Sequence, residues 1–239
     1  MLFIFDWDGT LCDSTGKIVR SMQQAAKQVR LPALDDTQVL NIIGLGLPEA
    51  VRHLYPDIST EQAEALRAAY SEHFLHYDQT PMPLFEGVEN TLHRLRDDGY
   101  RLAIATGKSR RGLERVLDGL GLRSFFHGSR CADETTSKPD PHMLLELLKE
   151  FRSQAADAVM VGDTEYDMEM ARRAQMPSVA VSYGAHHIER LRPYQPRLCI
   201  DRFEQITELV SASQTSFVSE HSTSLNGDNY VEVIAKAAD

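Results

Sequence analysis

Residues 2–11 read LFIFDWDGTL, and this stretch decides the fold of the chain. Its leading apolar residues are too few for a helix and are typical of a short buried strand. The strand ends at Asp6 and Asp8, and the chain then turns at Gly9-Thr10. Because an isolated buried charge is costly, two acids in this position indicate a functional role. The carboxyl ends of strands are also where open α/β sheets bind ligands.

The composition of the 239-residue chain is that of an ordinary globular protein, with 42% hydrophobic and 25% charged residues. Its formal net charge of −10 argues against a surface for nucleic acid or an anionic membrane, because such surfaces are rich in Lys and Arg. No apolar run approaches the length of a membrane span. The three cysteines include no Cys-x-x-Cys pair, so neither a zinc site nor a disulfide framework is expected. The chain begins directly with a strand and without a basic leader, which predicts a cytoplasmic location.

Residues 14–81 show helical periodicity without a strand signal. A capping box at Ser59 opens a long helix in this segment. We expect Tyr70, Phe74 and Tyr77 to share one face of that helix.

Short polar residues mark the starts of other helices. Asp36, Ser109 and Asp140 suit the N-cap position of the helices that follow them. Pro141 suits the first helical position after Asp140.

From about residue 84, helices alternate with apolar strands, which we expect at residues 101–105, 125–126, 158–161, 178–181 and 198–200. Such alternation predicts an α/β fold with a doubly wound parallel sheet, a Rossmann-like core. We therefore divide the chain into an α/β catalytic core of residues 1–13 and 82–210 and an inserted, all-helical cap of residues 14–81. Residues 211–239 are Ser-rich and lack a clear period, so we expect a flexible tail there.

Polar side chains follow two further strands. The second strand ends at Thr106-Gly107, and the third ends at Asp163, with Asp167 four residues later. Lys138 lies between them on a loop. Because the ends of parallel strands lie along one edge of a sheet, we expect these groups to meet the first two acids there.

The residue types of this set suit phosphate chemistry. Clustered carboxylates repel one another unless a cation lies among them, and Mg²⁺ prefers oxygen ligands and retains water molecules for a phosphate. Thr106 and the amides after it can donate hydrogen bonds to phosphate oxygens, and Lys138 supplies positive charge to the transferring group. One Asp can then attack phosphorus to form an acyl phosphate, and a second can move protons.

Each later piece alone has a simpler structural explanation. Thr106-Gly107 is also a helix start, Lys138 is also a solvated loop lysine, and Asp163 and Asp167 also suit an N-cap and a surface acid. Their joint occurrence at successive strand ends is much harder to explain structurally, and it favours an active site.

These residues resemble, in order, the four motifs of the haloacid dehalogenase-like hydrolases. The matching segments are Asp6-Trp7-Asp8-Gly9-Thr10, Thr106, Lys138-Pro139 and Gly162-Asp163-x-x-x-Asp167. The resemblance covers roughly residues 1–210. The helical insertion after the first motif is similar to the cap of the subfamily that includes phosphoglycolate phosphatases and β-phosphoglucomutases.

The resemblance implies a role for each acid. Asp6 would be the nucleophile and a Mg²⁺ ligand, and Asp8 would be the general acid and base, with its backbone carbonyl on the metal. Asp163 would be a direct or water-bridged Mg²⁺ ligand, and Asp167 would support the metal or orient Lys138.

The remaining motif residues have implied roles at the phosphate. Thr106, the Gly107 amide and Lys138 would bind the phosphoryl group. Gly9 and Thr10 complete the first motif as supporting residues. In the cap, the 44–48 loop and the cations Lys17, Arg20 and Arg52 are candidates for substrate choice, although each also suits a solvated surface.

The sequence therefore predicts a Mg²⁺-dependent phosphatase acting on a small phosphorylated metabolite, such as phosphoglycolate or a sugar phosphate, with no nucleic-acid or membrane partner. We expect a monomer or a homodimer. Two alternatives stay open at this point: a phosphosugar mutase of the β-phosphoglucomutase type, and a non-catalytic binding protein on the same fold.

Overall fold

The computed structural model describes residues 1–209. Met1–Gln205 form one compact unit, which holds the sheet and the candidate site, and a second unit begins at Ile206. The tail expected at residues 211–239 lies outside the described residues. Within residues 1–209, no helix combines the length and the apolar character that crossing a membrane requires.

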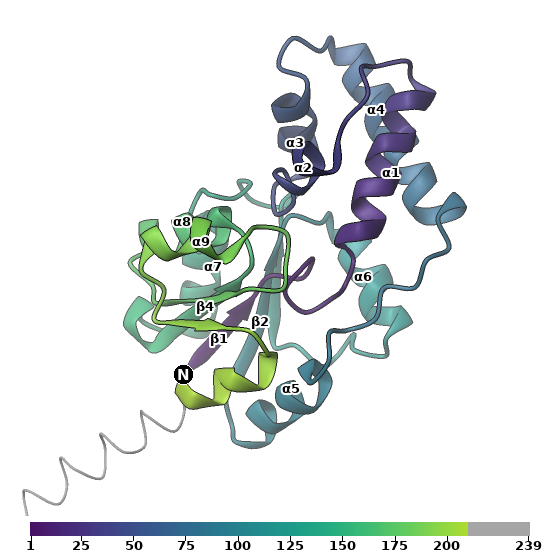
Figure 1. Cartoon of the computed structure of the whole chain (residues 1–239). Helices are drawn as coiled ribbons and strands as arrows, with labels where there is room; N and C mark the ends of the chain where they lie inside the picture. Colours follow the sequence, from purple (N-terminus) through teal and green to yellow (C-terminus); the bar gives the residue numbers. More distant parts are fainter. Residues whose placement is uncertain (210–239) are drawn as a thin grey trace, which may run out of the picture. The chain divides into compact units, whose positions relative to one another are not determined.

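The centre of the compact unit is a six-stranded parallel sheet with the strand order β3-β2-β1-β4-β5-β6 (Figure 1). The strands are β1 Leu2–Phe5, β2 Arg101–Thr106, β3 Gly128–Cys131, β4 Ala158–Gly162, β5 Ser178–Val181 and β6 Leu198–Ile200. The opening stretch supplies β1, which pairs with β2 on one side and β4 on the other. The prediction of a doubly wound parallel sheet is confirmed.

Helices follow most of the strands and flank the sheet (Figure 1). The core helices are α5 Val88–Asp97, α6 Arg110–Gly119, α7 His142–Phe151, α8 Glu165–Arg173 and α9 Ile188–Leu191. Short 3₁₀ turns lie at η2 Ala155–Asp157, η3 Arg192–Tyr194 and η4 Phe203–Ile206.

Alternate residues of β1 point to opposite faces of the sheet, as the strand period requires. Leu2 and Ile4 join an apolar cluster with side chains of α7 and α8, including Leu144. The ring of Phe3 instead packs edge-on against Tyr100. Both faces of the sheet are therefore buried, and β1 reads as a continuous apolar run because neither face meets water.

The segment between β1 and β2 contains only helices up to Tyr77. These are α1 Thr15–Gln28, α2 Asp36–Leu40, α3 Leu47–Leu54, α4 Thr60–Glu72 and the π-helical turn η1 His73–Tyr77. They share an apolar cluster whose fully buried members all lie between Ile18 and Ala69. This separate cluster supports the division into a core and a helical cap, which stays a prediction.

One predicted strand is wrong. Phe125-Phe126 lie in a turn, and the edge strand β3 begins at Gly128 instead. The Phe126 ring packs edge-on against the Trp7 ring, so this apolar residue is partly buried by a ring contact and does not belong to a strand. Strand β3 reads GSRC and has no apolar alternation, because its pairing with β2 defines it rather than its own side chains.

Two predicted helix starts also differ by one residue. Asp35, and not Asp36, caps α2. Helix α7 begins one residue after Pro141, although Asp140 still accepts a hydrogen bond from the His142 N–H at 3.0 Å. The predicted caps Ser59 and Ser109 are confirmed.

The side chains predicted to share one face of the long cap helix do not all do so at its C-terminal end. Helix α4 gives way to the π-helical turn η1 after Glu72. A π-helix bonds residue i to i+5, so side chains beyond this point rotate relative to an α-helix. Phe74 stays half-buried with Tyr70, whereas Tyr77 is 63% exposed and does not share their face.

Candidate active site

Three neighbouring strands end at candidate catalytic residues. Asp6 follows β1, Thr106 is the last residue of β2, and Asp163 follows β4. The backbone N–H of Asp6 donates to the Val161 carbonyl at 2.9 Å, which holds the first acid beside β4. Because β1 lies between β2 and β4, these residues share one edge of the sheet, at the point where the strand order reverses.

Lys138 joins the acids at the centre of the site. Its Nζ lies 2.7 Å from Asp6 Oδ1 and 2.7 Å from Asp167 Oδ1, and all three side chains are buried. Asp167 is also held by Thr164, whose backbone N–H and hydroxyl both donate to Asp167 Oδ2. The structure therefore brings the loop lysine to the strand-end acids, as the sequence predicts, and adds Thr164, which the sequence reasoning missed.

Asp163 has a partner for each of its carboxylate oxygens. The hydroxyl of Thr10 donates to Oδ1 at 2.7 Å, and the N–H of Ala185 donates to Oδ2 at 2.7 Å. Gly9 has a φ of +79°, and a Cβ built there would lie 2.2 Å from Asp163 Oδ2. Position 9 therefore requires glycine, because any larger residue would push away the acid that follows β4.

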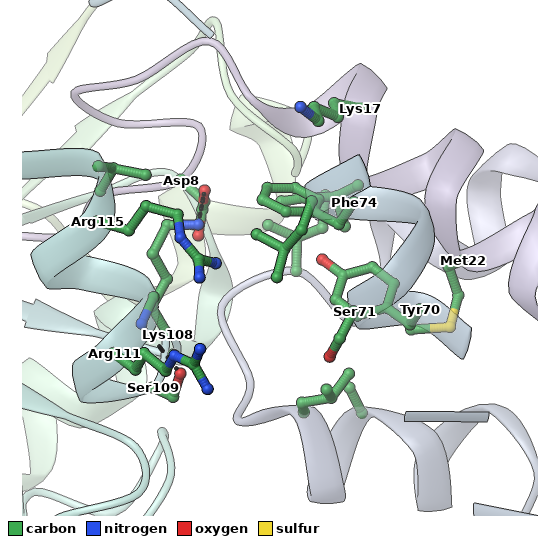
Figure 2. Close-up of a pocket in the computed structure, with 18 of the residues that line it drawn as sticks. Asp8, Lys17, Met22, Tyr70, Ser71, Phe74, Lys108, Ser109, Arg111 and Arg115 are labelled. Atoms are coloured by element: carbon green, nitrogen blue, oxygen red, sulfur yellow. Dashed lines mark hydrogen bonds and ion pairs between the residues drawn. The ribbon is translucent and has the colours of Figure 1, made fainter. Parts of the chain in front are cut away.

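Asp8 has different surroundings from the first acid. Lys108 Nζ lies 2.9 Å from Asp8 Oδ1, and Ser14 Oγ donates to the same oxygen. Figure 2 shows Asp8 and Lys108 together on the core side of the pocket. The sequence did not assign Lys108 or Ser14 to the site, although Lys108 directly follows the predicted phosphate-binding pair Thr106-Gly107 and could have been chosen on that ground.

The turn after β2 carries the predicted phosphate-binding residues Thr106 and Gly107. The Thr106 hydroxyl accepts a hydrogen bond from the Lys108 N–H at 3.2 Å, which leaves its own proton free to donate. A Cβ on Gly107 would lie 2.5 Å from the Leu45 carbonyl oxygen and 2.7 Å from that of Gly44. The cap loop therefore rests directly on this turn.

If all three buried acids were ionised, they would carry more negative charge than the lysine neutralises. Burial raises the pKa of Asp6 well above its ordinary value, although Lys138 opposes this shift. Burial also raises the pKa of Asp163 to about 7, and the charge of Asp167 adds to the effect. Burial alone would lower the pKa of Lys138, but the carboxylates of Asp167 and Asp6 raise it above its ordinary value. One ammonium group thus faces three carboxyl groups.

Three of these carboxyl groups fit a divalent cation. One oxygen from each of Asp6, Asp163 and Asp167 lies within 4.8 Å of the others. Asp6 Oδ2 is buried and has no hydrogen-bond partner within residues 1–209, so it is available as a ligand. Carboxylate oxygens are the ligands that Mg²⁺ prefers. Asp167, predicted as a supporting residue, belongs to this group, whereas the side chain of the predicted ligand Asp8 does not.

A cavity of about 920 Å³ extends from Asp6 and Asp8 toward the cap helices. Figure 2 shows Tyr70 and Phe74 on the cap side of this cavity and Arg111 on the core side. None of these three residues was identified from the sequence as part of the site. Their position depends on how the cap meets the core, which no local pattern encodes.

The predicted substrate-choice residues of the cap fall into two groups. Lys17 and the loop of residues 44–48 contribute to the cavity lining. Arg20 is ion-paired with Asp78 at 3.0 Å, and Arg52 is exposed; neither belongs to the lining. The structure therefore keeps Lys17 and the loop as candidates and excludes Arg20 and Arg52 from the cavity wall.

Comparison with known proteins places the chain among hydrolases. The family model described as haloacid dehalogenase-like hydrolase matches residues 3–181. A Dickeya dadantii protein named probable phosphatase IndB is 32% identical over 209 residues, which covers 86% of this chain and 91% of that protein. A Vibrio cholerae protein named phosphoglycolate phosphatase is 30% identical over 220 residues, covering 89% of this chain and 97% of that protein.

The fold has close counterparts among solved structures. A hydrolase from Pseudomonas syringae superposes with a TM-score of 0.79 at 25% identity. The superposition covers 88% of this chain and 98% of that chain. The similarity therefore extends over nearly all the residues that the structure describes.

Proposed function

The chain belongs to the haloacid dehalogenase-like hydrolase family, and we propose that it hydrolyses a small phosphomonoester through an aspartyl-phosphate formed on Asp6. The family resemblance of the sequence is confirmed, and so is the predicted enzyme class, a phosphatase hydrolase. The observation that carries the proposal is the arrangement of Asp6 and Asp8: both acids line one large cavity, and Asp6 is paired with Lys138 whereas Asp8 is paired with Lys108.

The turn after β2 and Lys138 would bind the phosphoryl group. The Thr106 hydroxyl and the Gly107 N–H would donate to phosphate oxygens, and the lysine ammonium would offset the negative charge of the phosphate. Asp163 and Asp167, with Asp6, would hold Mg²⁺. When bound, the ion would neutralise charge on the acids and on the phosphate.

The first chemical step assigns separate tasks to the two acids of β1. The Asp6 carboxylate attacks phosphorus, and the bond between phosphorus and the leaving oxygen breaks as the acyl phosphate forms. Asp8 donates its proton to the leaving oxygen, so the alcohol departs neutral. Lys108 and Ser14 hold the Asp8 carboxyl in position for this transfer.

The second step regenerates the enzyme. Asp8, now a carboxylate, takes a proton from water, and the hydroxide oxygen attacks phosphorus. The bond between phosphorus and Asp6 breaks, which releases inorganic phosphate and returns both acids to their starting states. The cap loop, which lies against Gly107, would limit access of bulk water to the acyl phosphate.

Phosphoglycolate, sugar phosphates and p-nitrophenyl phosphate form the first substrate panel, because a relative is named phosphoglycolate phosphatase. With Mg²⁺ present, we expect each productive substrate to release one inorganic phosphate per alcohol. Retention of phosphate on an isomerised sugar would instead favour the mutase alternative. A cytoplasmic location and a monomeric or homodimeric state stay predictions.

Substitution of the nucleophile tests the mechanism. Asp6→Asn should lower kcat on p-nitrophenyl phosphate by at least about a thousandfold, because an amide cannot form the acyl phosphate. Asp13→Asn is the matched control, since Asp13 is an exposed acid close by in the chain. Unchanged turnover in Asp6→Asn would rule out the assignment of Asp6.

A further inference from the structure

The cap side of the active-site cavity is largely apolar. Figure 2 shows Met22, Tyr70 and Phe74 of the cap along it, and Leu47 also contributes to the lining. Cavities of several hundred Å³ accommodate ligands far larger than a two-carbon acid. Such a small leaving group has too few apolar atoms to cover this wall, whereas an aromatic ring would remove the faces of Tyr70 and Phe74 from water.

The cavity exists while the cap already touches the core. The Gly46 N–H donates to Ser137 Oγ at 2.8 Å, and the Tyr166 hydroxyl donates to the Asn41 carbonyl at 2.8 Å. The Leu45 carbonyl also lies against the turn at Gly107. The volume of about 920 Å³ therefore belongs to a state in which the cap loop already covers the site.

Two arginines lie across the cavity from the apolar wall. Arg111 and Arg115 are on α6, one turn apart, and both are exposed and line the cavity (Figure 2). Within residues 1–209 neither guanidinium has an ion-pair or hydrogen-bond partner. By contrast, Arg110 on the same helix is paired with Glu134, and the nearby Arg123 is paired with Asp118.

Acids in the lining do not neutralise these arginines. Asp133 accepts a hydrogen bond from the Arg110 N–H at 2.8 Å, and Glu72 accepts one from the Tyr77 hydroxyl at 2.9 Å. A free guanidinium binds carboxylate or phosphate oxygens with paired donors. In a chain with a net charge of −10, two unpaired arginines at this cavity mark a local site for an anion.

We propose that the substrate is a phosphomonoester whose leaving group has an aromatic or similarly broad apolar body and a second anionic group. The apolar body would lie against Tyr70 and Phe74, and the second anion would meet Arg111 and Arg115. This inference rests on the proposed phosphatase function. It favours a leaving group larger than the glycolate of phosphoglycolate.

Three primary alkyl phosphates of similar intrinsic reactivity test the apolar part: ethyl phosphate, phenethyl phosphate and phosphoglycolate. We expect kcat/KM for phenethyl phosphate to exceed that for each of the other two by at least about tenfold, because burial of the ring favours its binding. Phe74→Ala should remove most of this preference. The exposed Tyr77, outside the cavity lining, gives the matched control Tyr77→Ala, which should keep it.

A carboxylated substrate tests the anion site. We expect para-carboxyphenethyl phosphate to have a kcat/KM about tenfold above that of phenethyl phosphate, through charge-assisted hydrogen bonds to the arginines. The double variant Arg111→Gln/Arg115→Gln should lose this ratio. Arg123→Gln also removes a surface positive charge, but outside the lining, and should retain it. Because each readout is a ratio measured on one protein sample, partial misfolding of a variant does not change it.

The outcomes separate this inference from the proposed function. Equal kcat/KM values for ethyl, phenethyl and carboxyphenethyl phosphates, or ratios unaffected by the Phe74 and arginine variants, would overturn the inference and leave the phosphatase function standing. No turnover of any of these compounds or of p-nitrophenyl phosphate would overturn both.

Discussion

Asp6 and Asp8 leave the same strand, yet their side chains have different neighbours. Asp6 is 1% exposed and is fixed by Lys138, whereas Asp8 lies between Ser14 and Lys108 at the cavity. A carboxylate that lines the cavity and is held in one orientation suits attack on phosphorus, and a carboxyl group beside the leaving oxygen suits proton transfer. The difference in surroundings therefore supports the proposed division of tasks.

The ion pair between Lys108 and Asp8 is expected to orient the acid for proton transfer. Lys108→Met should lower kcat by about tenfold to a hundredfold, with a smaller change in KM, because Asp8 would lose the ion pair that orients it. Lys108→Arg should recover part of the loss. Steady-state kinetics on p-nitrophenyl phosphate provide the measurement, and Lys149→Met, an exposed lysine on α7, serves as the control. A raised KM with an unchanged kcat would mean that Lys108 binds substrate and does not position Asp8.

The sequence predicted the site residues that lie at the ends of apolar strands, and it missed most of the side chains and backbone groups that contact them. Thr106 and Asp163 were identifiable because each ends a strand that belongs to a parallel sheet. The Ala185 N–H on Asp163 and the position of Arg111 depend on loops and helix faces that no local period specifies.

Among the contacts between structural elements, one that brings the cap onto the core joins the cap loop to the turn after β2. The Leu45 carbonyl approaches Gly107 so closely that a side chain there would lie 2.5 Å from it. This contact positions the cap over the predicted phosphate site and couples cap placement to the geometry of that turn.

Gly107→Ala tests this contact. The added Cβ must displace the cap loop, and overpacking of this kind costs about 1–3 kcal/mol. We expect kcat/KM to fall by about tenfold or more, because the covered state becomes less populated. Gly119→Ala on α6 is the matched control, since a Cβ there meets no atom within 4 Å. Wild-type kinetics in Gly107→Ala would show that catalysis does not need the observed cap position.

Two elements could not be predicted from their own residues. Strand β3 has the sequence GSRC and exists because β2 offers it backbone partners, so its hydrophobic pattern gives no signal. The π-helical turn η1 interrupts an apparently continuous helical period and separates Tyr77 from Phe74. By contrast, the capping box at Ser59 was predictable because its hydrogen bonds join residues three positions apart.

For the molecule as a whole, the site concentrates three acids within a folded core. Asp6, Asp163 and Asp167 are buried with a single ammonium, that of Lys138. Folding must remove these acids from water, which disfavours their ionised forms. A bound cation offsets this penalty, so metal binding and folding stability are linked.

This linkage predicts how pH and metal together affect unfolding. Burial raises the folded-state pKa of Asp6 well above its ordinary value and that of Asp163 to about 7. An acid with a raised folded pKa contributes stability that is fully present below its unfolded pKa and is lost as pH rises through the folded value. In chelator, the free energy of unfolding should therefore decline between about pH 4 and about pH 7 by a few kcal/mol. Mg²⁺ would bind the ionised acids, so its stabilising effect in thermal unfolding should be larger at about pH 8 than at about pH 5. Asp163→Asn should reduce both effects, whereas Asp13→Asn should not; a magnesium shift of equal size at the two pH values would contradict the linkage.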